Sequence, residues 1–280
     1  QVIFDKIRNT LEKTYTNYGF FPLDTPILED SKILLAKAGG ETEKQIYRFN
    51  KGDTDLTMRF DLTVPLAKYV AKNCSDLVFP FRRYQIGKVY RGERAQKGRF
   101  REFYQADIDI IGDGELGILN DAEIPSIIYS IFNSLGIDNF VIRINNRKVL
   151  NGLFDMYGLK DNATDVMRII DKIDKIGVEN VKSELADIGV DKDTVDTIIS
   201  VLTFKGCNSE VANMLSEYKG RNETFDKGIE ELVQVTDYIE KFGVPKDYFK
   251  IDLTIARGLD YYTGTVYETF IKDHPEYGSV

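Results

Sequence analysis

Polar and apolar side chains alternate along residues 100–111, and this pattern is the first indication of a chemical site. Successive side chains of a β-strand point to opposite faces, so Phe103, Gln105, Asp107 and Asp109 are predicted to share one face. The solvated outer face of a two-layer protein would show the same alternation. The pattern alone therefore leaves both interpretations open.

Neighbouring residues add the groups that a ligand site needs. Arg91 and Glu93 are predicted to share a face of the partner strand, and Arg257 to end a further strand. The other residues predicted on the same face of that further strand are apolar: Ile251, Leu253 and Ile255. A sheet face with arginine, glutamate, glutamine, aspartate and an aromatic ring has the parts for holding a charged, planar ligand.

The charge of the chain is unevenly distributed. The 280 residues carry a formal net charge of -8, which argues against a protein that binds nucleic acid over its whole surface. The segment from Arg82 to Glu102, however, contains eight basic residues and only two acidic ones. A local basic patch is therefore predicted in the same region as the polar strand face.

The elements that position these residues alternate between helix and strand. Helices are predicted over 3–18 and 62–73, and strands over 85–92, 100–111, 139–145, 251–257 and 263–271. Between about 156 and 244 the pattern changes to short amphipathic helices. The predicted fold class is α+β, with an antiparallel sheet flanked by helices in residues 1–155 and 246–280 and an inserted helical domain in residues 156–245.

Three long stretches resemble class II aminoacyl-tRNA synthetases in their histidyl-tRNA synthetase form. YRGERAQKGRFREFYQADIDIIG (90–112) resembles motif 2, ARGLDYYTGTVYE (256–268) is similar to the family's histidine signature, and TMRFDLTVP (57–65) resembles its amino-acid-binding loop. Pro26 resembles the motif 1 proline of the family's dimer interface. Three ordered matches are much harder to obtain by chance than one short pattern.

The resemblance implies an ATP-dependent ligase that activates L-histidine and transfers it to tRNA(His). Arg91 and Arg257 would hold the α-phosphate, because guanidinium stays charged and can bind oxygens bidentately. Glu93 would accept from the adenine amino group, Phe103 would stack on the ring, and Arg99 would reach the outer phosphates. Mg²⁺ would accompany the ATP; no protein side chain is assigned to hold it.

The histidine site is likewise implied by resemblance. Asp61, Thr63 and Gln105 would hold the ammonium group, and Asp109 and Tyr262, with Tyr261 beside it, would line the imidazole. The full predicted histidine-binding set is Asp61, Leu62, Thr63, Arg91, Gln105, Asp109, Arg257, Tyr261 and Tyr262. The predicted catalytic set is Arg91, Gln105 and Arg257.

Other interpretations of these residues remain open. Arg257 and Asp260 could form a structural ion pair, and Tyr261 and Tyr262 could be core aromatics. The regulatory subunit of ATP phosphoribosyltransferase shares the fold but does not charge tRNA, and its ATP-binding residues are expected to be replaced. In this sequence all four implied ATP-binding charges are present: Arg91, Glu93, Arg99 and Arg257. A synthetase-like module that senses RNA without turnover is a further alternative.

Expectations for the rest of the protein follow from the same resemblance. A homodimer is expected through the motif 1 segment, and the helical insertion would touch the tRNA acceptor stem. The match stops before motif 3 and the anticodon-binding domain, so weak adenylate formation is expected from this chain by itself. No apolar run approaches the roughly 20 residues that span a bilayer, so no membrane contact and a cytoplasmic location are expected.

Overall fold

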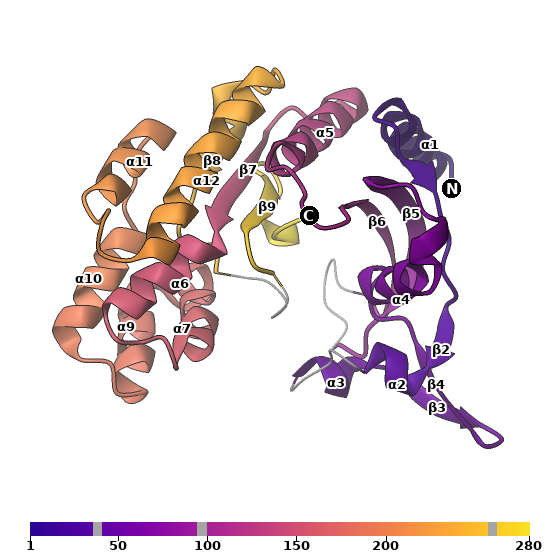
Figure 1. Ribbon diagram of the computed structural model, residues 1–280, viewed down its shortest axis with the longest axis horizontal. Coiled ribbons are helices and arrows are strands. Elements are labelled where there is room, and N and C mark those ends of the chain that lie inside the picture. The colour runs from indigo at the N-terminus through magenta and orange to yellow at the C-terminus, as the bar shows by residue number, and fades with distance from the viewer. Residues whose placement is uncertain (36–40, 94–99, 257–261) are drawn as a thin grey trace. The chain divides into compact units, whose positions relative to one another are not determined.

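The computed structural model describes residues 1–35, 41–93, 100–256 and 262–280 (Figure 1). These residues form two compact units, Gln1–Leu116 and Gly117–Val280. Both combine helices with strands that pair mainly antiparallel, which confirms the predicted α+β class. Arg99, Arg257 and Tyr261 of the predicted site, together with Asp260, lie outside the described residues.

The first unit contains two three-stranded sheets, ordered β1-β5-β6 and β2-β4-β3. Its elements are α1 (Val2–Asn17), β1 (Phe21–Pro22), β2 (Leu28–Asp30), α2 (Ser31–Leu34), α3 (Glu41–Gln45), β3 (Arg48–Lys51), β4 (Thr54–Met58), α4 (Thr63–Asn73), a 3-10 turn (Cys74–Asp76), β5 (Phe81–Tyr90) and β6 (Glu102–Ile111). The predicted helices at 3–18 and 62–73 correspond to α1 and α4.

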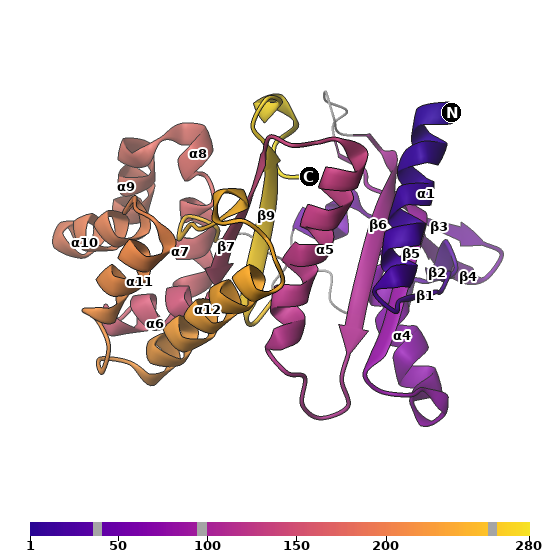
Figure 2. The same cartoon turned by 90° about the horizontal axis from the view of Figure 1, so that it is seen from above.

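Helix α1 covers one face of the β5–β6 hairpin, alongside which it runs in Figure 2. The ring of Tyr15 lies 5.4 Å from that of Tyr84, and its hydroxyl donates to the carbonyl of Ala106 at 3.5 Å. Further along, Phe4 packs on Tyr104 at 4.8 Å. The apolar stripe of α1 therefore packs on the even-numbered face of both strands, and the predicted site residues Gln105 and Asp109 lie on the odd-numbered face.

The second unit is built on a sheet ordered β8-β7-β9. Its elements are α5 (Leu119–Leu135), β7 (Phe140–Asn146), α6 (Arg147–Met156), α7 (Ala163–Ile170), α8 (Ile173–Ile176), α9 (Val178–Asp187), α10 (Lys192–Leu202), α11 (Asn208–Ser216), α12 (Glu223–Lys241), β8 (Phe249–Ile251) and β9 (Thr265–Ile271), with 3-10 turns at Lys246–Tyr248 and Pro275–Tyr277.

Helices α6 and α12 pack with their backbones in close approach. A Cβ atom at Gly152 would lie 2.4 Å from the amide nitrogen of Phe225, and one at Gly228 would lie 2.6 Å from that of Val149. The lack of a side chain at each glycine thus allows the backbone of the other helix to pack directly against it. This pair joins the sheet and the remaining helices around one core, in which Phe140, Phe154 and Phe225 are fully buried.

The predicted strand over 251–257 is wrong in extent. Strand β8 ends at Ile251, and residues 252–254 form a turn in which the Asp252 carboxylate accepts from both the amide and the hydroxyl of Thr254. Aspartate and threonine favour this local bonding over strand pairing. Ile251, Leu253 and Ile255 are nevertheless all buried.

The predicted separation of a catalytic from an inserted helical domain stays a prediction. Helices α7 to α12 lie within the range 156–245, but they share a core with β7, β8 and α6. Among the helices that the structure describes, none combines the length and apolar character needed to cross a membrane.

Candidate active site

The odd-numbered face of the β5–β6 hairpin brings the predicted strand residues together. The antiparallel register places Arg83 opposite Asp109, Gln85 opposite Asp107, Gly87 opposite Gln105 and Val89 opposite Phe103. Directly opposed side chains on one face are neighbours, so the polar members of the first three pairs form one surface, next to the apolar pair of Val89 and Phe103. Arg91 follows directly after β5.

Arg83 is the most deeply placed charge on this surface. Its side chain is 0% exposed, its Nε lies 2.9 Å from Oδ2 of Asp109, and its Nη2 donates to the carbonyl of Leu62 at 3.0 Å. Burial lowers the pKa of the guanidinium, whereas Asp109 opposes that change. Arg83 thus joins the hairpin to the segment that leads into α4, which contains Asp61 and Leu62 and continues into Thr63, the first residue of α4.

A second buried arginine, Arg59, fixes the same loop from its other end. Its Nε donates to the carbonyl of Lys88 at 2.7 Å, and its Nη1 donates to the carbonyl of Thr25. A Cβ at Gly87 would lie 2.5 Å from Nη2 of Arg59, so only glycine leaves room for this guanidinium. Gln85 completes the network by accepting from the hydroxyl of Thr25 at 3.1 Å.

Arg91 lies between two aromatic rings. Its guanidinium carbon is 4.4 Å from the centre of the Phe60 ring and 5.1 Å from that of Phe103, and Nε donates to the carbonyl of Phe60 at 3.2 Å. Cation–π contact of this kind restrains the planar group while keeping its charge. The arrangement suits a guanidinium that must hold an anion in a fixed orientation.

Three carboxylates share the surface with these arginines. Burial, followed by repulsion from Asp109, raises the pKa of Asp107 to about 6. Burial also raises the pKa of Asp109, against the effect of Arg83, and that of Asp61, against an amide hydrogen bond from Val64 at 3.0 Å and the charge of Arg91. The surface therefore favours a cationic group that would offset the carboxylate charge.

Gln105 presents an acceptor to this surface. Its Oε1 is buried and, among the residues that the structure describes, has no hydrogen-bond partner. A buried acceptor left in this state is destabilising, so it is expected to bind a donor from a ligand or water. Gln105 faces Gly87 across the hairpin.

The remaining predicted residues are more scattered. Leu62 is fully buried, Thr63 begins α4, and Glu93 is partly buried, with its backbone carbonyl accepting from Nε of Arg101 at 3.4 Å. Tyr262 is 46% exposed and belongs to the second unit. The three predicted residues outside the described ranges, Arg99, Arg257 and Tyr261, keep their roles as predictions.

Sequence reasoning missed both buried arginines and gave Asp107 no role. Arg83 lies two residues before Gln85 and therefore on the same face of β5. The strand predicted from the sequence begins at residue 85, so Arg83 falls outside it. Pro80 directly before β5 was the available signal for the true boundary. Nothing in the local pattern indicates Arg59, because its partners are 29 and 34 residues distant.

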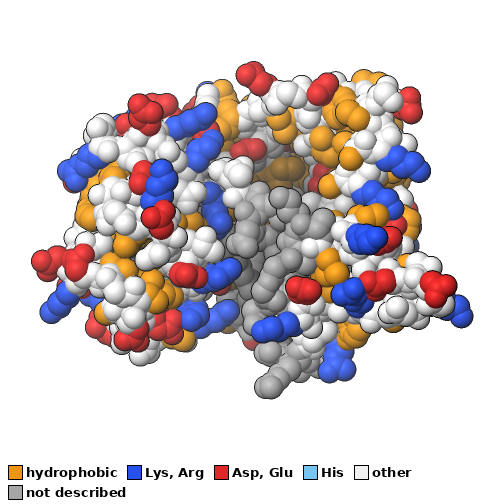
Figure 3. Space-filling model, turned by 60° about the horizontal axis from the view of Figure 1, so that its bottom comes forward, with side chains coloured by type: hydrophobic (Ala, Val, Ile, Leu, Met, Phe, Trp, Pro, Cys, Tyr) orange, Lys and Arg blue, Asp and Glu red, His pale blue; other side chains and the backbone are white. Residues whose placement is uncertain are grey.

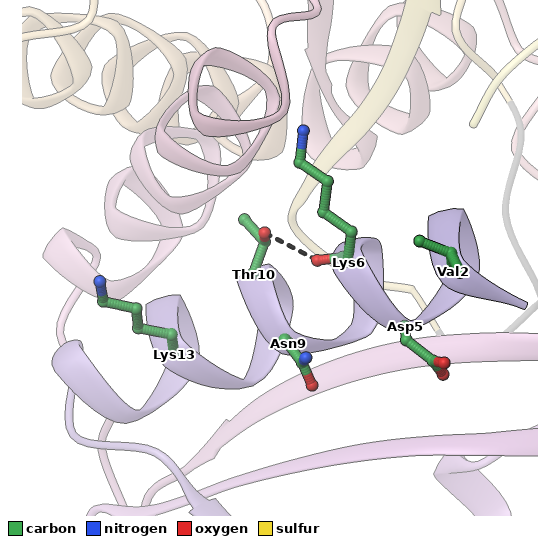
Figure 4. A pocket seen from close by; sticks show the side chains of 6 residues that line it. All are labelled: Val2, Asp5, Lys6, Asn9, Thr10 and Lys13. Atoms are coloured by element: carbon green, nitrogen blue, oxygen red, sulfur yellow. Dashed lines mark hydrogen bonds between the residues drawn. The ribbon is translucent and has the colours of Figure 1, made fainter.

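Two other surface features carry less chemistry. A shallow pocket is lined by six residues of α1 alone, shown in Figure 4: Val2, Asp5, Lys6, Asn9, Thr10 and Lys13. Acidic and basic side chains are interspersed on the face shown in Figure 3. In the helical region Lys172 pairs with Glu184, and Lys182, partly buried, pairs with Asp196; ion pairs at or near the surface contribute little to stability.

A sequence model described as histidyl-tRNA synthetase matches residues 3–277. The chain belongs to the histidyl-tRNA synthetase family. Two bacterial relatives named histidine–tRNA ligase align with all 280 residues, at 60% identity in Clostridium tetani and 49% in Finegoldia magna. The chain spans 64% and 65% of the length of these two relatives.

Solved structures agree with the family and the fold. The crystal structure of histidyl-tRNA synthetase from Nostoc sp. PCC 7120 is 40% identical with a TM-score of 0.89, over 98% of this chain and 63% of that one. A protein from Bacillus halodurans described as an ATP phosphoribosyltransferase regulatory subunit/histidyl-tRNA synthetase is 22% identical with a TM-score of 0.80, over 96% of this chain and 69% of that one. At that identity the second likeness supports the fold alone.

Proposed function

We propose that this chain contributes the amino-acid and ATP site of a histidine–tRNA ligase, which joins L-histidine to ATP and then to tRNA(His). The observation that supports this most directly is the surface around Gln105. A buried acceptor without a partner among the described residues lies on a strand face with two aspartates of raised pKa. An amino acid's ammonium group supplies both the donors and the positive charge that this surface favours.

In this proposal the two ends of histidine meet different groups. Gln105 and Asp61 accept from the ammonium group, with Thr63 beside them at the start of α4. Asp109, held by Arg83 at 2.9 Å, accepts from an imidazole N–H. A carboxylate oxygen that accepts from the substrate N–H loses that hydrogen bond when a side chain without a donor is bound, and sites of this kind can discriminate by ~10⁴. Tyr262, and Tyr261 outside the described residues, would line the ring.

Arg91 acts on the phosphate. The histidine carboxylate oxygen attacks the α-phosphorus, a new P–O bond forms, the bond to the bridging oxygen breaks, and pyrophosphate leaves with that electron pair. Arg91, held between Phe60 and Phe103, would stabilise the charge on the α-phosphate oxygens from one side, and Arg257 from the other. Phe103 would also stack on adenine, with Glu93 accepting from its amino group and Arg99 reaching the outer phosphates.

Mg²⁺ would arrive with ATP, where it would neutralise phosphate charge. Within the described ranges, no group of three or more histidine, cysteine or acidic side chains is placed to hold a metal ion.

A homodimer belongs to the same proposal. Pro26 is exposed and is followed by Ile27 at 40% and Leu28 at 45% exposure, with Phe21 at 70% nearby in sequence. Exposed apolar residues of this kind suit a symmetric interface between two copies. A cytoplasmic location and contact of the helical region with the tRNA acceptor stem complete the proposal.

Histidine-dependent exchange between ATP and pyrophosphate tests the activation step. The product of the complete gene should catalyse exchange that requires histidine, and Arg91→Ala should reduce its rate by at least about 100-fold, as expected for a group that stabilises transition-state charge. Lys182→Met, on the surface of the helical region, is the matched loss of one positive charge and should leave exchange unchanged. Absence of exchange in the wild type would favour the regulatory-subunit alternative.

A further inference from the structure

A run of three consecutive polar residues is buried where β7 ends and α6 begins. Asn145 and Asn146 are 0% exposed and Arg147 is 8% exposed. Polar side chains are buried only at a cost unless their hydrogen bonds are made within the protein. The identity of their partners therefore shows what the run holds in place.

The partners of Asn145 and Arg147 lie on both sides of residues 257–263, which belong to the histidine signature. The Asn145 side-chain amide donates to the carbonyl of Ile255 at 2.9 Å, and Nη1 of Arg147 donates to that of Ala256 at 2.6 Å. On the other side, the Arg147 backbone amide donates to the carbonyl of Gly264 at 2.8 Å. One residue thus binds the chain both before and after residues 257–263.

Arg147 is itself anchored on a tightly packed pair of helices. It is the first residue of α6, whose Asn146 cap accepts from the amide of Lys148 at 2.9 Å and donates to Glu231 of α12 at 3.0 Å. Lys148 also pairs with Glu231. Because α6 and α12 are in backbone contact through their glycines, the start of α6 has little freedom to shift.

We propose that Arg147 is a positioning residue that fixes the chain on both sides of residues 257–263, within the histidine signature, and thereby supports histidine binding. The inference rests on the proposed function for the role of the signature itself. The proposed role of Arg147 requires no contact with the substrate. Its guanidinium holds the chain at Ala256, and its main-chain amide holds the chain at Gly264.

Arg147→Met separates the two contacts, because it removes the guanidinium that binds Ala256 and keeps the main-chain amide that binds Gly264. Hydrogen exchange measured by mass spectrometry should accelerate in peptides covering residues 249–256, where Ala256 loses its donor, and change less in those covering 264–271. Arg147→Lys, which retains a donor, should give a smaller effect of the same kind. Val181→Ala removes buried methyl groups from α9, far along the chain from both flanks, and controls for general loss of stability.

Kinetics then connect position to function. At a temperature where all variants are folded, Arg147→Met should lower kcat/KM for histidine in ATP–pyrophosphate exchange by about 10- to 100-fold, as small displacements of binding groups do. Val181→Ala should lower the melting temperature and leave that ratio near the wild-type value. Should the methionine variant not fold, Arg147→Lys carries the same comparison.

Two failures remain distinguishable. The positioning role would be overturned if hydrogen exchange in residues 249–256 were unchanged in a folded Arg147 variant. It would also be overturned if Val181→Ala lowered kcat/KM as much as Arg147→Met does. A wild-type protein without histidine-dependent exchange activity would instead refute the proposed function, and the hydrogen-exchange comparison would still decide whether Arg147 fixes the two flanks.

Discussion

Replacement of Asp107 by asparagine should stabilise the protein at neutral pH and have little effect near pH 4. Burial and the neighbouring Asp109 raise the pKa of Asp107 to about 6, even though Arg83 and Arg91 act in the opposite direction. The charged form of Asp107 is therefore unfavourable in the folded state. Asparagine keeps nearly the same shape without the charge.

The sign of the pH dependence follows from proton linkage. Because the pKa of Asp107 is higher in the folded than in the unfolded chain, the folded state binds its proton more tightly, and the stability due to this group falls as pH rises from about 4 to about 6. A pKa of about 6 instead of 3.8 corresponds, at about 1.36 kcal/mol per pH unit, to roughly 3 kcal/mol. Partial solvent access lowers this, so about 1–3 kcal/mol is expected above pH 7.

Urea unfolding at pH 4 and pH 7.5 measures this gain as a difference between variant and wild type. Asp55→Asn is the control of opposite sign, since its hydrogen bonds from Arg48 and Ser31 lower the pKa of Asp55 to about 2, and the variant should lose stability at pH 7.5. A gain for Asp107→Asn that is equal at both pH values, or a loss at pH 7.5, would refute the reasoning.

Three further substitutions test the packing of the site and the fold. Arg83→Met leaves Asp109 buried without its partner and should lower the free energy of unfolding by about 3–5 kcal/mol, measured by urea titration. Gly87→Ala should cost about 1–3 kcal/mol and reduce histidine-dependent exchange, because the added methyl displaces Arg59; normal stability would contradict that packing. Asn222→Ala removes the cap of α12 and should lower stability by about 1 kcal/mol, seen in thermal melts, without changing exchange.

Local pattern was sufficient to predict most of the elements. The amphipathic periods over 3–18 and 62–73 correspond to α1 and α4, and the short helices predicted between about 156 and 244 correspond to α7 to α12. These elements depend on neighbours in sequence. Their prediction needs no knowledge of tertiary contacts.

The site was only partly predictable, for a physical reason. Strand alternation placed Gln105 and Asp109 on one face, which the register of the hairpin confirms. The charges that hold this face are fixed by distant contacts, such as that of Arg59 beneath Gly87, and these leave no local pattern. The strand predicted over 251–257 failed because turn bonding by Asp252 competes with the alternation.

Charging of tRNA(His) with labelled histidine by the product of the complete gene tests the central proposal most directly. Histidyl-tRNA should form with ATP present, none of the other standard amino acids should replace histidine, and Asp109→Asn should lose charging by a large factor while remaining folded. Charging with a different amino acid, or a folded protein that neither charges tRNA nor supports histidine-dependent exchange, would contradict it.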